Sequence, residues 1–361
     1  MPDIKDWGYT GEMAGAEFEN EKLTIGRIVC ARREQFEAVC EKGFLRARPK
    51  SGEYFRGAES IDFPTVGDFV LLSYNPAEES LIVKTLERKT VFSRSDLGGH
   101  KAGYGRTSVE QVIAANFDYV CAVMSLNQNY NARRLERYMA LTWASGAAPV
   151  VVLTKADLTE QRRMYLSEVM RVAPGAEVFA LSAYTGEGLE EFKAFLKPRK
   201  TLAFLGSSGV GKSSLINVLM GEEALRVGEV RADDARGRHT TTHRELCMLP
   251  SGTMVIDTPG MRELGVLGAD DGIDAAFSEI EALAKKCRFS DCTHTSEPGC
   301  AVKSALQSGA LDRTRYESYR TLTKENRAAV RRQNAVNLRQ KNRIRPEDRP
   351  RDKSYKRTDG K

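Results

Sequence analysis

The sequence lacks a long hydrophobic run, since no apolar stretch approaches the roughly 18 residues that a membrane-spanning helix needs. The polar N-terminal segment, MPDIKDWGYTGEM, also lacks the basic and then apolar pattern of a secretory signal. These two absences predict a cytoplasmic protein that does not associate with a membrane.

Cysteine is scarce, with 7 residues in a chain of 361, and the odd number argues against a complete disulfide framework. Four of them, Cys30, Cys40, Cys121 and Cys247, stand singly among apolar neighbours, so we interpret them as small core residues. The other three crowd between positions 287 and 300.

Acidic residues are rare at the C-terminal end of the chain. From Arg320 to Lys361 there are 15 Lys and Arg but only 5 Asp and Glu, whereas the whole protein has a net charge of +6. All of the positive excess therefore lies in this tail. Such asymmetry is typical of an arm that binds nucleic acid or a membrane surface, and equally of a solvated, disordered solubility tail.

Residues 1–95 are predicted to contain a small β-barrel. Between positions 23 and 90, turns rich in glycine, proline and charge separate five short β-rich runs: LTIGRIVCA, FEAVC, FLRARP, GDFVLLS and SLIVKTL. Five such strands suit a small barrel, and the oligonucleotide-binding (OB) barrel is one candidate. The basic residues of this unit suit either nucleic-acid binding or an ordinary charged surface; they are Arg32, Arg33, Lys42, Arg46, Arg48 and Lys50.

The rest of the chain is predicted to form a linker, an α/β domain and a helical domain. Residues 91–110 are rich in Gly, Ser and charge, which is typical of an exposed loop, and the linker itself is placed at 96–110. Residues 111–268 alternate strand and helix patterns, which predicts a mostly parallel sheet covered on both faces. Residues 269–335 are predicted to be helical, and residues 336–361 have the composition of a disordered basic tail.

The segment GSSGVGKSS fits the phosphate-binding pattern G-x-x-x-x-G-K-[ST] in full, with an apolar strand pattern before it and a helical pattern after it. Its glycines let backbone N–H groups point at phosphate oxygens. Lys212 can supply charge to the β- and γ-phosphates, and the Ser213 hydroxyl can ligate Mg²⁺. The residues predicted to contact nucleotide here are Gly206, Ser207, Ser208, Gly209, Val210, Gly211, Lys212, Ser213 and Ser214.

Two further segments suit the γ-phosphate and Mg²⁺. In VIDTPG, Asp257 ends a buried strand pattern and can hold Mg²⁺ through water, while Gly260 offers a backbone N–H to the γ-phosphate. The long polar loop 228–246 contains TTT, where Thr241, or its neighbour Thr240, can complete the Mg²⁺ shell as a switch threonine does. A disordered surface loop is the alternative interpretation of this segment.

A guanine-reading loop is predicted upstream, in the segment VVLTKADL. The Asp157 carboxylate can accept hydrogen bonds from guanine N1–H and the 2-amino group, a pair of donors that adenine lacks. The stem of Lys155 can lie along the base, and Thr154 stands where GTPases more often have Asn. After the next strand pattern, Ser182 and Ala183 match the SA turn whose backbone N–H meets guanine O6.

The base-reading segments therefore precede the phosphate loop, and the switch segments come last. An ordinary GTPase has the reverse order, so the sequence predicts a GTPase domain that is circularly permuted. Permutation is physically tolerable when the original termini lie close together at the surface.

A metal-binding pattern follows in CRFSDCTHTSEPGC, where Cys287, Cys292, His294 and Cys300 have the spacing C-x4-C-x-H-x5-C. Three thiolates and one imidazole suit tetrahedral Zn²⁺, and metal is favoured over disulfides in a cytosolic chain. Because protein atoms fill all four positions, the site is predicted to be structural and to help a small helical domain fold.

These features together resemble the ribosome small-subunit-dependent GTPase A family, over residues from about 23 to 320. The matching segments are TKAD, GSSGVGKSS, GRHTTT, DTPG and CRFSDCTHTSEPGC. The resemblance implies an OB-like barrel, GTP hydrolysis that is slow alone and faster on the small (30S) ribosomal subunit, and a role in late 30S maturation. It implies 16S rRNA and GTP or GDP as partners of a chain expected to be monomeric.

The catalytic water needs an orienting group, and many GTPases use a Gln directly after the DxxG glycine. Met261 occupies that position and cannot serve, so slow intrinsic hydrolysis is expected. With the family resemblance, His239 in GRHTTT becomes the predicted catalytic residue, although a solvent-exposed loop histidine is the alternative.

Two other functions stay open at this point. One is an ATPase or kinase with the same phosphate loop, against which Asp157 and the SA turn argue. The other is a non-catalytic rRNA-binding module that uses GTP as a structural ligand, which Met261 keeps open.

Overall fold

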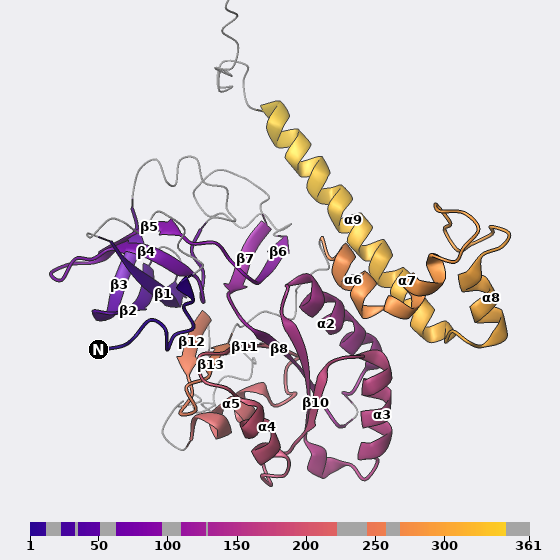
Figure 1. Ribbon diagram of the computed structural model, residues 1–361, viewed down its shortest axis with the longest axis horizontal. Helices are drawn as coiled ribbons and strands as arrows, with labels where there is room; N and C mark the ends of the chain where they lie inside the picture. The colour runs from indigo at the N-terminus through magenta and orange to yellow at the C-terminus, as the bar shows by residue number, and fades with distance from the viewer. Residues whose placement is uncertain are drawn as a thin grey trace, which may run out of the picture.

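The computed structural model describes residues 1–11, 23–32, 35–50, 63–95, 110–127, 129–221, 244–257 and 268–343. Figure 1 shows an N-terminal barrel beside a central α/β unit, with a helical unit at the other side that ends in a long helix. The predicted multi-domain fold is confirmed in this arrangement.

Five strands close the N-terminal barrel. They are β1 (Leu23–Arg32), β2 (Gln35–Cys40), β3 (Gly43–Pro49), β4 (Phe69–Ser73) and β5 (Ser80–Thr85). Their order is β1-β2-β3-β5-β4, and β4 pairs again with β1, so the barrel has no open edge between them. Alternate side chains fill its interior, among them the buried Ile28, Val70 and Ile82. All five predicted strands are present, and the closed five-stranded barrel agrees with the OB-like prediction.

A short two-stranded sheet connects the barrel to the central unit. It pairs β6 (Val91–Ser95) with β7 (Glu110–Ala115) in antiparallel fashion. The prediction of a loop over residues 91–110 was therefore wrong at 91–95 and at 110, because these residues pair across the two strands and so satisfy their backbone hydrogen bonds.

The central sheet has the order β10-β9-β8-β11-β13-β12. Its strands are β8 (Tyr119–Ser125), β9 (Ala148–Thr154), β10 (Glu177–Ala180), β11 (Thr201–Leu205), β12 (Arg244–Met248) and β13 (Met254–Asp257). All neighbouring pairs are parallel except β12 with β13. This confirms the mostly parallel sheet that the alternating pattern predicted.

Helices cover both faces of this sheet, namely α2 (Ala132–Ala144) and α3 (Arg162–Val172) on one face, and α4 (Leu189–Phe195) and α5 (Lys212–Met220) on the other. Successive residues of a strand point to opposite faces, and β8 follows this rule. Met124 packs in the cluster that contains Leu135 of α2, whereas Val123 packs with Phe192 of α4. Both sides of β8 are therefore buried.

The barrel and the central sheet are one continuous 11-stranded sheet, because β1 pairs with β12. Strand β12 begins at Arg244, whereas the sequence predicted a polar loop over 228–246. The loop prediction was therefore wrong for its last three positions.

The fully buried Arg27 of β1 fixes the joint between barrel and sheet. It donates to backbone oxygens of Trp7 at 2.5 Å, Gly67 at 3.3 Å and Asn116 at 2.7 Å, and to the Met254 sulfur at 3.1 Å. Burial lowers the pKa of Arg27 to about 10, so the guanidinium stays protonated at neutral pH. Its donors satisfy three carbonyl groups and one sulfur atom, from four segments that are distant in sequence.

The C-terminal unit consists of α6 (Asp270–Ala276), α7 (Ser278–Ala284), α8 (Ala301–Ser308) and the long α9 (Arg313–Arg343). Helix α6 lies directly on α2, where a Cβ at Gly272 would come within 2.2 Å of the Ala140 carbonyl oxygen, so only glycine permits this approach. Helix α9 continues past the domain boundary predicted at 335, because its Ala-, Arg- and Gln-rich sequence favours a helix as far as Arg343.

A buried arginine anchors α9 to the central unit. Arg315 donates to Glu136 of α2 at 2.9 Å and to Glu279 of α7 at 2.6 Å, and its guanidinium lies over the Phe277 ring. Breaking such a pair leaves one charge buried without its partner, which makes the contact a strong determinant of how α9 docks. Among the described helices, none is long and apolar enough to cross a membrane.

Candidate functional site

The predicted phosphate loop connects β11 to α5, the strand and the helix that the sequence pattern places on either side of it. Gly209 and Gly211 have φ angles of 74° and 94°, a left-handed conformation in which a side chain would be strained. Gly206 must also be small, because a Cβ there would lie 2.8 Å from the Val123 carbonyl oxygen. The loop therefore turns tightly over the end of the sheet and ends at the N-terminus of α5, where backbone N–H groups can meet an anion.

Lys212 folds back over this loop. Its Nζ donates to the carbonyl oxygens of Gly206 at 2.7 Å and Ser207 at 2.8 Å. The Val210 side chain is buried in the core and anchors the loop, whereas Ser208, Ser213 and Ser214 are exposed. The exposed hydroxyl of Ser213, at the start of α5, is accessible to a bound metal ion.

The predicted base-reading loop lies directly against the phosphate loop. Thr154 ends β9 with only 2% of its surface exposed, and its hydroxyl donates to the carbonyl oxygen of Val210. Lys155 has a left-handed backbone, with φ 56°, and its Nζ donates to the carbonyl oxygen of Gly209 at 2.8 Å. The threonine that replaces the usual asparagine thus has a definite role, which is to join the two loops.

The predicted SA turn follows β10 and lies next to the same loop. The backbone N–H of Ala156 donates to the Leu181 carbonyl oxygen at 3.1 Å. This hydrogen bond places Ser182 and Ala183 beside the exposed Asp157. The buried Ser182 Oγ accepts from the backbone N–H groups of the next residues, Tyr184 and Thr185, at 3.2 Å each. The turn therefore has a fixed shape.

A brace that the sequence did not reveal holds these two loops together. Arg162 at the start of α3 forms a bidentate ion pair with Glu187, at 2.5 and 2.8 Å, and donates to the Ala156 carbonyl oxygen at 3.2 Å. The Arg162 hydrogen bond lowers the pKa of the Glu187 carboxyl below its usual value. Bidentate pairs fix orientation, so this one sets the distance between the base-reading loop and the SA turn.

A second unpredicted contact reaches the phosphate loop from α2. Arg134 Nη1 donates to Ser207 Oγ at 3.1 Å and to Asn129 Oδ1 at 3.0 Å, and Asn129 donates to the same serine at 3.4 Å. The segment SLNQNYNARR carries no motif of its own, so only the folded arrangement reveals it.

The switch residues are placed only in part. Asp257 ends β13, next to β11 and its phosphate loop, as predicted, but its side chain lies outside the described residues. Gly260, His239 and Thr241, with its alternative Thr240, also lie outside the described residues. Their predicted roles remain predictions.

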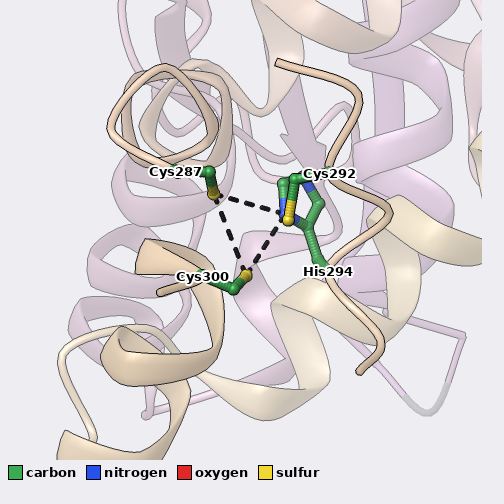
Figure 2. Close-up of side chains that lie close together, drawn as sticks. All are labelled: Cys287, Cys292, His294 and Cys300. Atoms are coloured by element: carbon green, nitrogen blue, oxygen red, sulfur yellow. Dashed lines mark hydrogen bonds between the residues drawn. The ribbon is translucent and has the colours of Figure 1, made fainter. Parts of the chain in front are cut away.

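The four predicted metal ligands meet in the C-terminal unit, as Figure 2 shows, and their ligand atoms all lie within 4.8 Å of one another. The Sγ atoms of Cys287 and Cys300 are 3.8 Å apart, and the His294 Nδ1 lies 3.6 and 3.4 Å from them. A tetrahedral Zn²⁺ with ordinary bond lengths needs edges of about 3.8 Å between two sulfurs and about 3.6 Å between sulfur and nitrogen. The group, completed by Cys292, could therefore hold a metal ion.

Two neighbours shape the loop that carries these ligands. Glu297 accepts from the backbone N–H groups of Thr293 and Thr295 at 2.9 Å each and from Ser296 at 3.0 Å. Tyr316 of α9 donates to the His294 carbonyl oxygen at 3.3 Å. Cys300 also accepts from the Lys303 backbone N–H and caps α8, so the site connects α7, α8 and α9.

Comparison with known proteins decides the family. The family model described as RsgA GTPase matches residues 85–267. Small ribosomal subunit biogenesis GTPase RsgA 1 of Listeria innocua is 42% identical over 326 residues, which cover 89% of this chain and 89% of that protein. The chain belongs to the RsgA GTPase family.

Two solved structures share the fold of this chain. YjeQ from Thermotoga maritima has a TM-score of 0.62 at 26% identity and matches 83% of this chain and 97% of its own. YloQ, described as a circularly permuted GTPase, has a TM-score of 0.57 at 23% identity, covering 89% of this chain and 98% of its own, and shares the fold. The rotated order of motifs in this RsgA family member is thus a property of a known fold.

Proposed function

We propose that the protein binds guanine nucleotide between its permuted loops, hydrolyses GTP to GDP and phosphate, and assists late maturation of the small (30S) ribosomal subunit. The observation that carries this proposal is the contact between the two predicted loops. Thr154 and Lys155 donate to Val210 and Gly209, which lie 56 and 54 residues further along the chain. The name of the Listeria innocua relative, a small ribosomal subunit biogenesis GTPase, supplies the biological process.

Each loop has a distinct task in this proposal. The backbone of residues 206–214 binds the phosphates, with Lys212 neutralising the β- and γ-phosphates. The exposed Asp157 reads the guanine donors, Lys155 lies along the base, and the backbone at Ser182 and Ala183 meets guanine O6.

Two metal ions belong to the proposal. Mg²⁺ bound with GTP would be held by Ser213 and Thr241, with Asp257 acting through water, and it neutralises phosphate charge. One structural Zn²⁺ would be held by Cys287, Cys292, His294 and Cys300, whose spacing suits its tetrahedral geometry.

Catalysis in this proposal depends on a histidine. Met261 cannot orient the attacking water, so His239, which precedes β12 in the sequence, is proposed to do so on the small subunit. The 16S rRNA would be bound mainly through its phosphates, by basic residues of the barrel and of α9 and the tail. A monomer acting in the cytoplasm suits such a partner.

Replacing Asp157 with asparagine is expected to shift nucleotide preference from GTP to xanthosine triphosphate by about 100-fold, since two charge-assisted hydrogen bonds are lost. Xanthine has a carbonyl where guanine has its amino group, so the new amide can donate to it. Competition against a fluorescent GDP derivative measures the shift. Glu160→Gln, at an exposed position of the same loop, is the matched control, and an unchanged GTP preference in D157N would contradict the base-reading role.

Co-sedimentation with purified small subunits tests the proposed function. The protein is expected to sediment with the subunits when a non-hydrolysable GTP analogue is present, and less so with GDP. The corresponding ATP analogue should give no more binding than the absence of nucleotide. Equal binding in all four conditions would favour the alternative, a non-catalytic rRNA-binding module that holds GTP as a structural ligand.

A further inference from the structure

Helix α2 carries three arginines whose partners differ. Arg133 and Arg137 pair with carboxylates of α9, namely Glu317 at 3.4 Å and Glu325. Arg134 lies about 100° around the helix from Arg133 and faces the phosphate loop instead. No carboxylate pairs with Arg134 within the ranges that the structure describes, and its contacts there are neutral oxygen atoms.

A hydrogen-bond network fixes the position of Arg134. Asn131 caps α2 and accepts from the Arg134 backbone N–H at 2.9 Å. The Asn127 side chain accepts from the Asn129 backbone N–H at 3.0 Å, and Asn129 in turn accepts from the guanidinium at 3.0 Å. The half-buried guanidinium is therefore held at Ser207 before any nucleotide binds.

Ser207 lies on the γ-phosphate side of the loop. Lys212 Nζ, which serves the β- and γ-phosphates in loops of this pattern, lies 2.8 Å from the Ser207 carbonyl oxygen. The guanidinium of Arg134 lies 3.1 Å from the Ser207 hydroxyl oxygen, so both cations converge on one residue. A half-buried guanidinium without a carboxylate partner, such as that of Arg134, is suited to binding an anionic ligand.

We propose that Arg134 is a positioning residue supplied in cis to the nucleotide site. Through Ser207 it fixes the start of the phosphate loop and places positive charge next to the terminal phosphate of GTP. Charge develops there in the transition state of phosphoryl transfer, so the contribution of Arg134 is larger in the transition state than in the GDP complex. This inference rests on the proposed function, because it assumes that the site hydrolyses GTP.

Single-turnover hydrolysis and binding of GDP with aluminium fluoride, a mimic of the transition state, test this role. Arg134→Gln is expected to lower the hydrolysis rate by about 10- to 100-fold and to weaken the aluminium fluoride complex by a similar factor. The affinity for GDP alone and the melting temperature should change little. Arg134→Lys, which keeps the charge but loses the planar fork, should recover part of the loss. Arg133→Gln on the same helix, paired with α9, is the matched control and should behave as wild type.

Two results would overturn the inference. If R134Q hydrolysed GTP and bound GDP with aluminium fluoride as well as the wild-type protein does, Arg134 would have no role in the reaction. A parallel fall in rate, GDP affinity and melting temperature would show that it only packs α2 against the loop. Absence of turnover by the wild-type protein, measured in the same assay with small subunits present, would instead contradict the proposed function itself.

Discussion

Replacing Lys212 with alanine is expected to weaken GTP binding by about 100-fold, with hydrolysis lost at ordinary nucleotide concentrations. The Lys212 ammonium lies over the phosphate loop, where its Nζ is 2.7 and 2.8 Å from two backbone carbonyl oxygens. When nucleotide binds, phosphate oxygens would take the place of these carbonyl oxygens as hydrogen-bond partners of Lys212. Hydrogen bonds to charged groups contribute about 1.5–3 kcal/mol each, and this cation faces several phosphate oxygens. Equilibrium titration with a fluorescent GTP analogue measures the loss.

The fold should survive this substitution, since Lys212 is half-buried and the loop geometry depends on its glycines. Lys193→Ala on α4, where the side chain pairs with Glu190 on the exposed surface, is the matched control and should bind GTP normally. If K212A bound GTP as wild type does, the loop would not be the phosphate site. An equal loss in K193A would point to a nonspecific effect.

Removing the metal is expected to unfold the segment between α7 and α8 and to reduce the stability of the C-terminal unit by about 5 kcal/mol or more. Structural zinc contributes roughly 10–16 kcal/mol to small zinc-binding peptides, and here part of the unit is also held by the Arg315 contacts with α2. A chelator, or Cys292→Ser, should lower helix content and expose the amides of residues 287–300 to hydrogen exchange. Metal analysis should find one zinc ion per wild-type chain.

GDP affinity should persist after metal removal, because the nucleotide loops belong to the central sheet and not to the metal site. Cys247→Ser on β12, outside the metal group, is the matched control and should retain its zinc. Unchanged exchange of residues 287–300 after complete chelation would refute the structural role. Loss of GDP affinity together with the metal would show that the two sites depend on one another for folding.

Local patterns account for what could be predicted from the sequence. A phosphate loop needs glycine where φ is positive, and Gly209 and Gly211 occupy such positions. The glycines of the motif therefore predict the backbone conformation of the loop. The four candidate metal ligands lie within fourteen positions of each other, and so their spacing alone limits where they can meet. The strands of the barrel, and those of the central sheet except β12, follow from alternating and continuous apolar runs.

Contacts between distant segments could not be predicted in this way. The pairing of β1 with β12 joins residues more than 200 positions apart, and no periodicity in either strand indicates its partner. The contact of Arg134 with Ser207 and the brace of Arg162 with Glu187 likewise use ordinary surface residue types. Such contacts depend on how whole elements pack, which single-sequence patterns do not specify.

The decisive measurement is GTP turnover by the wild-type protein and by His239→Ala, each with and without purified small subunits and with ATP as control. A small-subunit-dependent GTPase should hydrolyse GTP slowly alone and clearly faster with small subunits, should not respond with ATP, and should lose the increase in the variant. Absence of GTP turnover by the wild-type protein under every condition would contradict the claim that this is a small-subunit-dependent GTPase.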